Sequence, residues 1–171
     1  MEIGQGPYMR RYLVCSDIHG CVWNYELALE QAGHIDAIMI AGDVGIRMSE
    51  LMVMTPNIPV YAVAGNNDMF QTHLPKWKVV TEGRHRIFMA HGHMHGIYMH
   101  FDVIEKDARK NNCDIVIFGH THRYYMAEKN GILFLNPGAL KGMARYSYRT
   151  YMVLEFEDDG NFHVIEGKIQ D

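Results

Sequence analysis

Two histidines separated by a single residue, His120 and His122, follow a short apolar segment of the chain. That segment, 115–118, is a run of β-branched and aromatic residues that ends at Gly119, so we predict a short buried strand. The histidines would then lie in the loop at the carboxyl end of this strand, where open α/β sheets place their ligand crevices. Two imidazoles in such a loop indicate a metal site.

Four other apolar segments end in side chains that can bind a metal ion. The carboxylates, amides and imidazoles concerned are Asp17 and His19 after 12–15, Asp43 after 37–41, Asn66 and Asn67 after 60–64, and His91 and His93 after 86–90. Each motif alone is weak evidence, but chance does not supply the same arrangement five times in order. The repetition predicts a metal-binding site built from loops at strand ends.

The segments between these motifs indicate alternating strands and helices. Helices are predicted over 22–32 and 48–54, between the first three strands, which is typical of a parallel sheet with covering helices. A third helix is predicted over 99–110. Turn signals at 82–85, 130–131 and 158–160 predict hairpins, so we expect the C-terminal half to supply an antiparallel sheet. The predicted fold class is mixed α/β, with two β-sheets packed face to face and helices outside.

Length and composition indicate one domain over residues 1–171, with residues 1–8 as an N-terminal extension. The formal net charge of −4 argues against a broad nucleic-acid surface. The three cysteines lack Cys-x-x-Cys spacing, so we expect no disulfide framework and a reducing compartment. Since no apolar run approaches a membrane span and the N-terminus lacks the apolar core of a signal peptide, we predict a cytoplasmic protein without membrane contact.

The ordered set of strand-end motifs resembles that of the calcineurin-like metallophosphoesterases, and in particular their small single-domain bacterial and archaeal branch. The resemblance extends from about Tyr12 to at least Gly138, which is most of the chain. It implies a four-layer αββα sandwich and a metal-dependent phosphoesterase, with a phosphodiesterase favoured. The implied substrate is a small phosphate ester. Members of the family often form homodimers or homotetramers, and the sequence does not distinguish between them.

The resemblance also implies a binuclear metal centre in which Asp43 bridges two divalent ions. One ion would be bound by Asp17, His19, Asp43 and His122, and the other by Asp43, Asn66, His91 and His120. Oxygen and imidazole ligands without a thiolate suit Mn²⁺ first, with Fe, Ni²⁺, Co²⁺ or Zn²⁺ as the other candidates. The expected reaction is the attack of a metal-bound hydroxide on phosphorus.

Asn67 and His93 are the remaining candidates for a role in catalysis. Many relatives carry a histidine at the position of Asn67 that protonates the leaving group, and an amide cannot act as a general acid. We therefore expect better turnover of esters with acidic leaving groups, such as aryl phosphodiesters. His93 is expected either to contact phosphate or to orient His91. His95 and His100 are predicted to be surface or helix-start residues.

Two other functions are compatible with this fold. The first is a non-catalytic scaffold that binds metal and a partner protein, in the manner of the retromer subunit, which the same superfamily resemblance implies. That scaffold departs from the ligand set, whereas every ligand position is filled here. The second is a nuclease like the double-strand-break repair enzymes of the superfamily, which requires further domains that this sequence does not contain.

Overall fold

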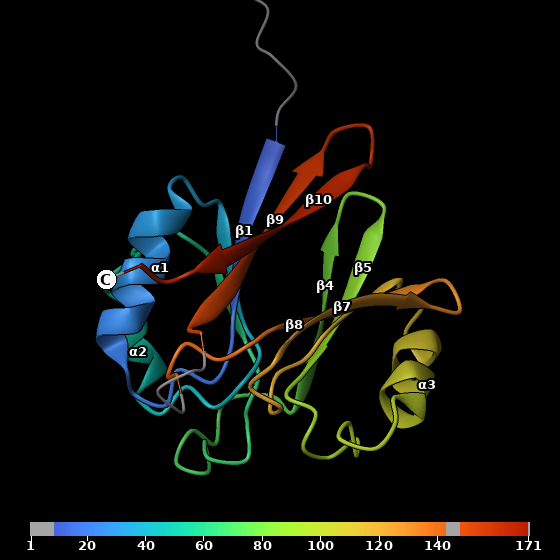
Figure 1. The fold of residues 1–171 in the computed structure, drawn as a ribbon, viewed down its shortest axis with the longest axis horizontal. Helices are drawn as coiled ribbons and strands as arrows, with labels where there is room; N and C mark the ends of the chain where they lie inside the picture. The colour runs from blue at the N-terminus through green and yellow to red at the C-terminus, as the bar shows by residue number, and fades with distance from the viewer. Residues whose placement is uncertain (1–8, 143–147, 171) are drawn as a thin grey trace, which may run out of the picture.

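The structure, a computed structural model, describes residues 9–142 and 148–170, and the expected N-terminal extension, 1–8, lies outside them. In chain order the elements are β1 (Met9–Cys15), α1 (Val22–Ala32), β2 (Ala37–Ile40), α2 (Met48–Met52), β3 (Val60–Ala62), β4 (Trp77–Glu82), β5 (His85–Ala90), α3 (Asp102–Lys110), β6 (Ile115–Ile117), β7 (Tyr124–Lys129), β8 (Ile132–Pro137), β9 (Thr150–Glu157) and β10 (Phe162–Lys168). Figure 1 shows α1 and α2 outside one sheet and α3 outside the other, which confirms the predicted four layers.

The two sheets have five strands each. The first has the order β10-β9-β1-β2-β3, in which β1, β2 and β3 are parallel and β9 is antiparallel to both β1 and β10. The second has the order β4-β5-β6-β8-β7, with β5, β6 and β8 parallel and antiparallel strands at both edges. The expectation of an antiparallel C-terminal sheet was therefore wrong. The hairpins were predicted correctly, but β9–β10 joins the first sheet.

Alternating side chains of the central strands fill three apolar layers. Leu13 and Cys15 of β1 face α1 and α2, whereas Tyr12 and Val14 face the second sheet. On the far side of the second sheet, Val116 packs in the same cluster as the buried residues of α3. Each sheet is buried on both faces, which explains why its central strands are continuous apolar runs in the sequence.

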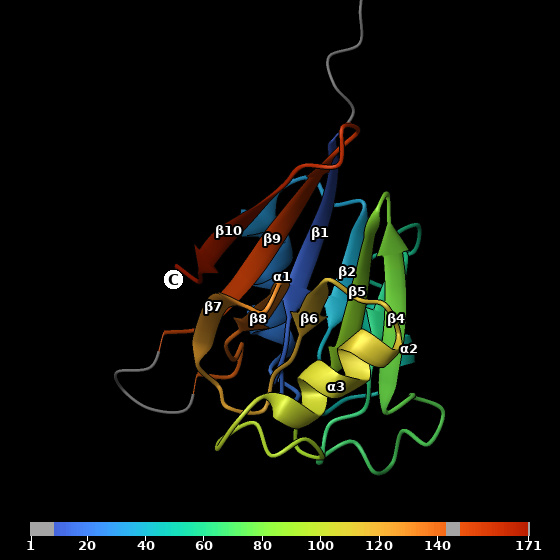
Figure 2. The ribbon, with the colours of Figure 1, turned by 90° about the vertical axis from the view of Figure 1, so that its right-hand side faces the viewer.

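The loops that follow β1, β2, β3, β5 and β6 gather at one end of the molecule, seen at the bottom of Figure 1 and again in Figure 2. These are the five loops that carry the strand-end motifs. The third helix begins at Asp102 rather than near residue 99, so that the residues just before it belong to the loop after β5. Among the described residues, none of the helices combines the length and apolar character needed to cross a bilayer.

Candidate metal centre

The backbone of the strand-end loops is strained at the predicted ligands. Within residues 9–142 and 148–170, seven residues other than glycine have a positive φ, and five of the seven are predicted ligands. These five are Asp17, His19, Asp43, His120 and His122, with φ between 48° and 67°. A left-handed conformation costs a non-glycine residue about 1–2 kcal/mol, and such strain concentrates at functional sites. The strain therefore marks the same residues that the sequence motifs indicate.

Asp68 ties two of these loops together. Its buried carboxylate accepts hydrogen bonds from the backbone N–H of Gly65 at 2.9 Å, of Val44 at 3.0 Å and of Gly45 at 3.2 Å. The loop after β2 is thereby held against the loop after β3. Asp68 was not among the predicted site residues, because a carboxylate that accepts a hydrogen bond from a backbone amide 24 residues away has no local signal in the sequence.

Gly65 allows the closest approach between these two loops. A Cβ atom at this position would lie 2.0 Å from Oδ1 and 2.3 Å from the backbone nitrogen of Asp43. Any side chain here would therefore displace the carboxylate predicted to bridge the metal ions. Glycine is required here because a Cβ atom would clash with Asp43, and not because of the φ angle.

The carboxylate of Asp17 is oriented by hydrogen bonds to one of its two oxygens. Oδ2 accepts from the hydroxyl of Ser16 at 2.6 Å and from the backbone N–H of His120 at 3.1 Å. Oδ1 is fully buried, and no described residue meets the geometry of a hydrogen bond to it, although His122 Nε2 lies 2.9 Å away. A buried carboxylate oxygen without a donor is costly unless a cation is bound to it, so Oδ1 fits a metal ligand. Ser16 was not foreseen as a positioning residue.

Two groups of donor atoms converge around Asp17. In the first, Asp17 Oδ1 lies 2.9 Å from His122 Nε2 and 3.6 Å from His19 Nε2. The second group consists of Asp17, Asp43 and His91, and His91 Nε2 lies 3.3 Å from Asp43 Oδ2. Within each group the donor atoms all lie within 4.8 Å of one another, which is close enough to hold a metal ion. These residues come from both sheets, so the site spans the interface between them.

His91 has a fixed orientation. Its Nδ1–H donates to the backbone carbonyl of Ala41 at 2.7 Å, which directs Nε2 toward Asp43 and leaves it 3.1 Å from the side-chain oxygen of Asn66. A carbonyl partner for the distal nitrogen is the usual support of a metal-binding histidine. The side-chain oxygen of Asn66 therefore lies beside the second donor group.

His120 and His93 lie near the two donor groups but belong to neither of them. The ring of His120 packs edge to face against that of His91, with centroids 5.1 Å apart, but His120 belongs to neither donor group of the described residues. It lines a cavity of about 510 Å³ together with Asp43 and His122. His93 contacts the His91 ring at 5.4 Å and lines a neighbouring cavity instead. His95, expected at the surface, is buried with Nε2 3.3 Å from a carboxylate oxygen of Asp107.

Asn67 is directed toward the predicted bridging carboxylate. Its side-chain amide donates to Asp43 Oδ2 at 2.8 Å, and its backbone N–H donates to Oδ1 at 2.8 Å. Burial raises the pKa of Asp43, but the neighbouring His91 and the two hydrogen bonds from Asn67 outweigh burial and bring the pKa to about 2. Asp17 is more deeply buried, yet the imidazoles of His122 and His19 lower its pKa as well. Both carboxylates are therefore ionised near neutral pH, which is the state that binds a cation.

Comparison with known proteins shows which proteins this chain resembles. Residues 10–159 match the family model described as the calcineurin-like phosphoesterase superfamily domain. A probable metallophosphoesterase of Bacillus subtilis is 28% identical over 148 residues, which are 86% of this chain and 85% of the relative. A phosphodiesterase of Methanocaldococcus jannaschii is 26% identical over 144 residues, which are 75% of this chain and 83% of the relative.

Solved structures share the fold. A predicted phosphoesterase of Streptococcus pneumoniae superposes with a TM-score of 0.74 at 24% identity, covering 94% of this chain and 98% of the other. The vacuolar protein sorting 29 protein of Entamoeba histolytica, solved in complex with zinc, superposes with a TM-score of 0.70 at 23% identity, covering 94% of this chain and 99% of the other. At these identities the likeness describes the fold alone.

Proposed function

The chain belongs to the calcineurin-like phosphoesterase superfamily, and from this premise we propose that it is a metal-dependent phosphodiesterase with a binuclear centre. The observation that carries the proposal is the convergence of two ionised carboxylates and three imidazoles around Asp17 Oδ1, a buried oxygen that no described residue reaches with hydrogen-bond geometry. Relatives named as metallophosphoesterases and as a phosphodiesterase support the same class of reaction.

The proposed ligands divide into two sets that share Asp43. The first set is Asp17, His19, Asp43 and His122, and the second is Asp43, Asn66, His91 and His120. Two divalent cations, with Mn²⁺ favoured over Fe, Ni²⁺, Co²⁺ or Zn²⁺, would supply Lewis-acid polarisation of the phosphate and a water of lowered pKa as the nucleophile. No side chain of the protein is needed as a nucleophile.

Several residues of the chain prepare this site. Ser16 and the His120 backbone hold one oxygen of Asp17 and leave the other directed at the donor groups. Asn67 holds the Asp43 carboxylate, and since an amide does not give up a proton near neutral pH, we assign it a positioning role without proton transfer. His93 packs against His91 and away from the Asp43 cavity, which favours orientation of His91 over contact with phosphate.

The test is hydrolysis of bis-p-nitrophenyl phosphate by metal-stripped protein to which Mn²⁺, Ni²⁺, Zn²⁺ or Mg²⁺ is restored. We expect Mn²⁺ to restore turnover and Asp43→Ala to lower it by more than about 100-fold, because loss of a direct ligand exceeds the usual effect of a ligand's supporting residue. Asp159→Ala, in the exposed turn before β10, is the matched control and is expected to keep full activity.

Turnover that persists in Asp43→Ala would refute the proposed centre. Tight metal binding without turnover by any of the four ions would instead favour the alternative, a scaffold that binds metal and a partner protein. The superposition on the vacuolar protein sorting 29 fold makes that outcome structurally reasonable.

A further inference from the structure

A second cavity opens beside the candidate metal centre. It has a volume of about 310 Å³ and is lined by the loop before α3, by Phe118 and Thr121, and by residues 123–125. Three side chains, those of Tyr98, Thr121 and Arg123, line both this cavity and the larger one around Asp43. The two cavities therefore adjoin, and a ligand with its phosphate at the candidate centre can extend into the second cavity.

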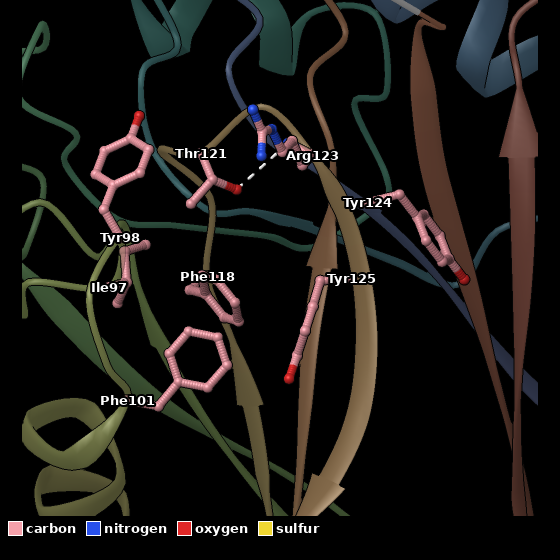
Figure 3. Close-up of a pocket in the computed structure, with 8 residues that line it drawn as sticks. All are labelled: Ile97, Tyr98, Phe101, Phe118, Thr121, Arg123, Tyr124 and Tyr125. Carbon is pink, nitrogen blue, oxygen red and sulfur yellow. Dashed lines mark hydrogen bonds between the residues drawn. The ribbon is translucent and has the colours of Figure 1, made fainter.

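The walls of the second cavity are aromatic, and we name it the aromatic cavity. Figure 3 shows Phe101 next to Phe118 and Tyr125, with the Tyr98 ring beyond them. The ring of Phe101 lies 5.2 Å from that of Phe118 and 5.2 Å from that of Tyr125. Phe118 is buried and closes the cavity. Because Phe134 stacks on Phe101 with ring centroids 5.2 Å apart, and Lys129 Nζ lies 5.1 Å over the same ring, Phe101 offers a ligand the edge of its ring. Aromatic surfaces of this kind bind planar rings by edge-to-face contact.

Tyr98 is fixed between the two cavities. Its hydroxyl donates a hydrogen bond to the backbone carbonyl of His120 at 3.0 Å, and its ring lies 5.0 Å from the His120 ring. About two thirds of the side chain is nevertheless exposed, at 66%. An exposed tyrosine held in one orientation presents a ring face at little further cost in conformational entropy.

Polar groups are available at the edge of the aromatic cavity. Arg123 is exposed, and none of the described carboxylates lies within ion-pair distance of its guanidinium. Its backbone N–H donates to the Thr121 hydroxyl at 3.3 Å, the dashed line in Figure 3. The hydroxyl of Tyr125 likewise has no hydrogen-bond partner among the described residues. A guanidinium between a metal centre and an aromatic wall fits a phosphate that carries a ring with heteroatoms at its edge.

We propose that the aromatic cavity binds the nucleobase of a small nucleotide phosphodiester while Arg123 binds the phosphate. The proposal rests on the proposed function, because the phosphate must lie at the candidate centre for the base to reach this cavity. It adds the substrate class, which the metal ligands leave open, and assigns specificity to Phe101 and Tyr125.

Two probes that differ only in the base test this proposal without catalysis. Adenosine 5′-monophosphate and ribose 5-phosphate are titrated calorimetrically into Mn²⁺-loaded protein, because the ionised carboxylates of a metal-stripped centre would repel the phosphate of either probe. We expect the nucleotide to bind about 5- to 150-fold more tightly, the range given by stacking one base on aromatic side chains. Phe101→Leu and Tyr125→Leu should reduce this ratio toward one, because leucine is apolar but has no aromatic ring for the base to contact.

Two further variants separate the contribution of the phosphate from that of the base. Arg123→Gln should weaken both probes by a similar factor of about ten, since it removes a charge-assisted contact to phosphate and leaves the rings in place. Tyr148→Leu, at an exposed tyrosine outside the aromatic cavity, makes the same chemical change as Tyr125→Leu and should leave the ratio unaltered.

Equal binding of the two probes would overturn the proposal, as would a ratio that survives in both leucine variants. Failure of the proposed function is a separate result, since it is measured as turnover in the metal-restored protein. A base-dependent ratio that is lost in Phe101→Leu or Tyr125→Leu supports the aromatic cavity even if no ion restores turnover.

Discussion

Asp68→Asn tests whether the contact between the loops after β2 and β3 maintains the metal centre. The carboxylate accepts hydrogen bonds from the three backbone amides of Val44, Gly45 and Gly65. Asparagine keeps one acceptor oxygen and turns an NH₂ group toward the remaining donor. One buried N–H without a partner costs about 1–3 kcal/mol, and loss of charge on the remaining bonds brings the expected destabilisation to about 2–4 kcal/mol.

For a chain of this length, that destabilisation corresponds to a decrease in Tm of about 4–16 °C. The assay is thermal and urea unfolding of metal-stripped protein, followed by calorimetric titration with Mn²⁺. Because Asp43 lies beside the affected amides, we also expect the Mn²⁺ affinity to fall by about 10- to 100-fold.

Asp159→Asn is the matched control for this substitution. Asp159 also accepts a backbone hydrogen bond, from Asn161 at 2.8 Å, but it is exposed to solvent. We expect its free energy of unfolding to change by no more than about 0.5 kcal/mol and its Mn²⁺ affinity to be unchanged. If Asp68→Asn were as stable as this control and bound Mn²⁺ as tightly as the wild type, the loop contact would not support the centre.

Three further outcomes are expected. Gly65→Ala should abolish Mn²⁺ binding in calorimetric titrations, because its Cβ would lie 2.0 Å from the Asp43 carboxylate, whereas Gly83→Ala, with nothing within 4 Å, should bind Mn²⁺ normally. Mn²⁺ at 100 times its Kd should stabilise the protein by about 2.7 kcal/mol and raise Tm by about 5–11 °C, and a chelator should reverse the shift in a thermal melt. Since Asn67 cannot donate a proton, p-nitrophenyl phosphodiesters should be hydrolysed at least about 100-fold faster than matched alkyl diesters in steady-state assays, and equal rates would contradict this role.

The local elements of the fold were predictable from the sequence. The helix over 22–32 was predicted with the bounds that α1 has, because its apolar spacing and the following Gly33 are local signals. The wrong expectation concerned which strands pair. β9 pairs with β1, so that Met9 lies opposite Glu157, although most of the sequence separates the two residues. Hairpin turns specify which neighbouring strands meet, but they do not specify which sheet the hairpin joins.

The candidate site likewise contains residues that the sequence predicted and residues that only the structure revealed. Asp17, Asp43 and His91 were predicted because each follows an apolar strand, and the structure brings them together. The supporting roles of Ser16 and Asp68 were not predicted, since each depends on contacts that only the folded loops create. The aromatic cavity was missed for a similar reason, because its side chains belong to segments 17 or more residues apart that carry no shared motif.

The left-handed backbone at five predicted ligands also bears on how the sequence can drift over evolutionary time. At each of these positions, glycine would remove a conformational cost of about 1–2 kcal/mol but would also remove the donor atom. A lineage that ceased to use the centre would therefore gain folding stability by losing it. The left-handed backbone conformations of His120, with φ of 67°, and Asp17, with φ of 53°, are unfavourable for folding. We therefore attribute these residues to the chemistry at the ends of the strands and not to folding.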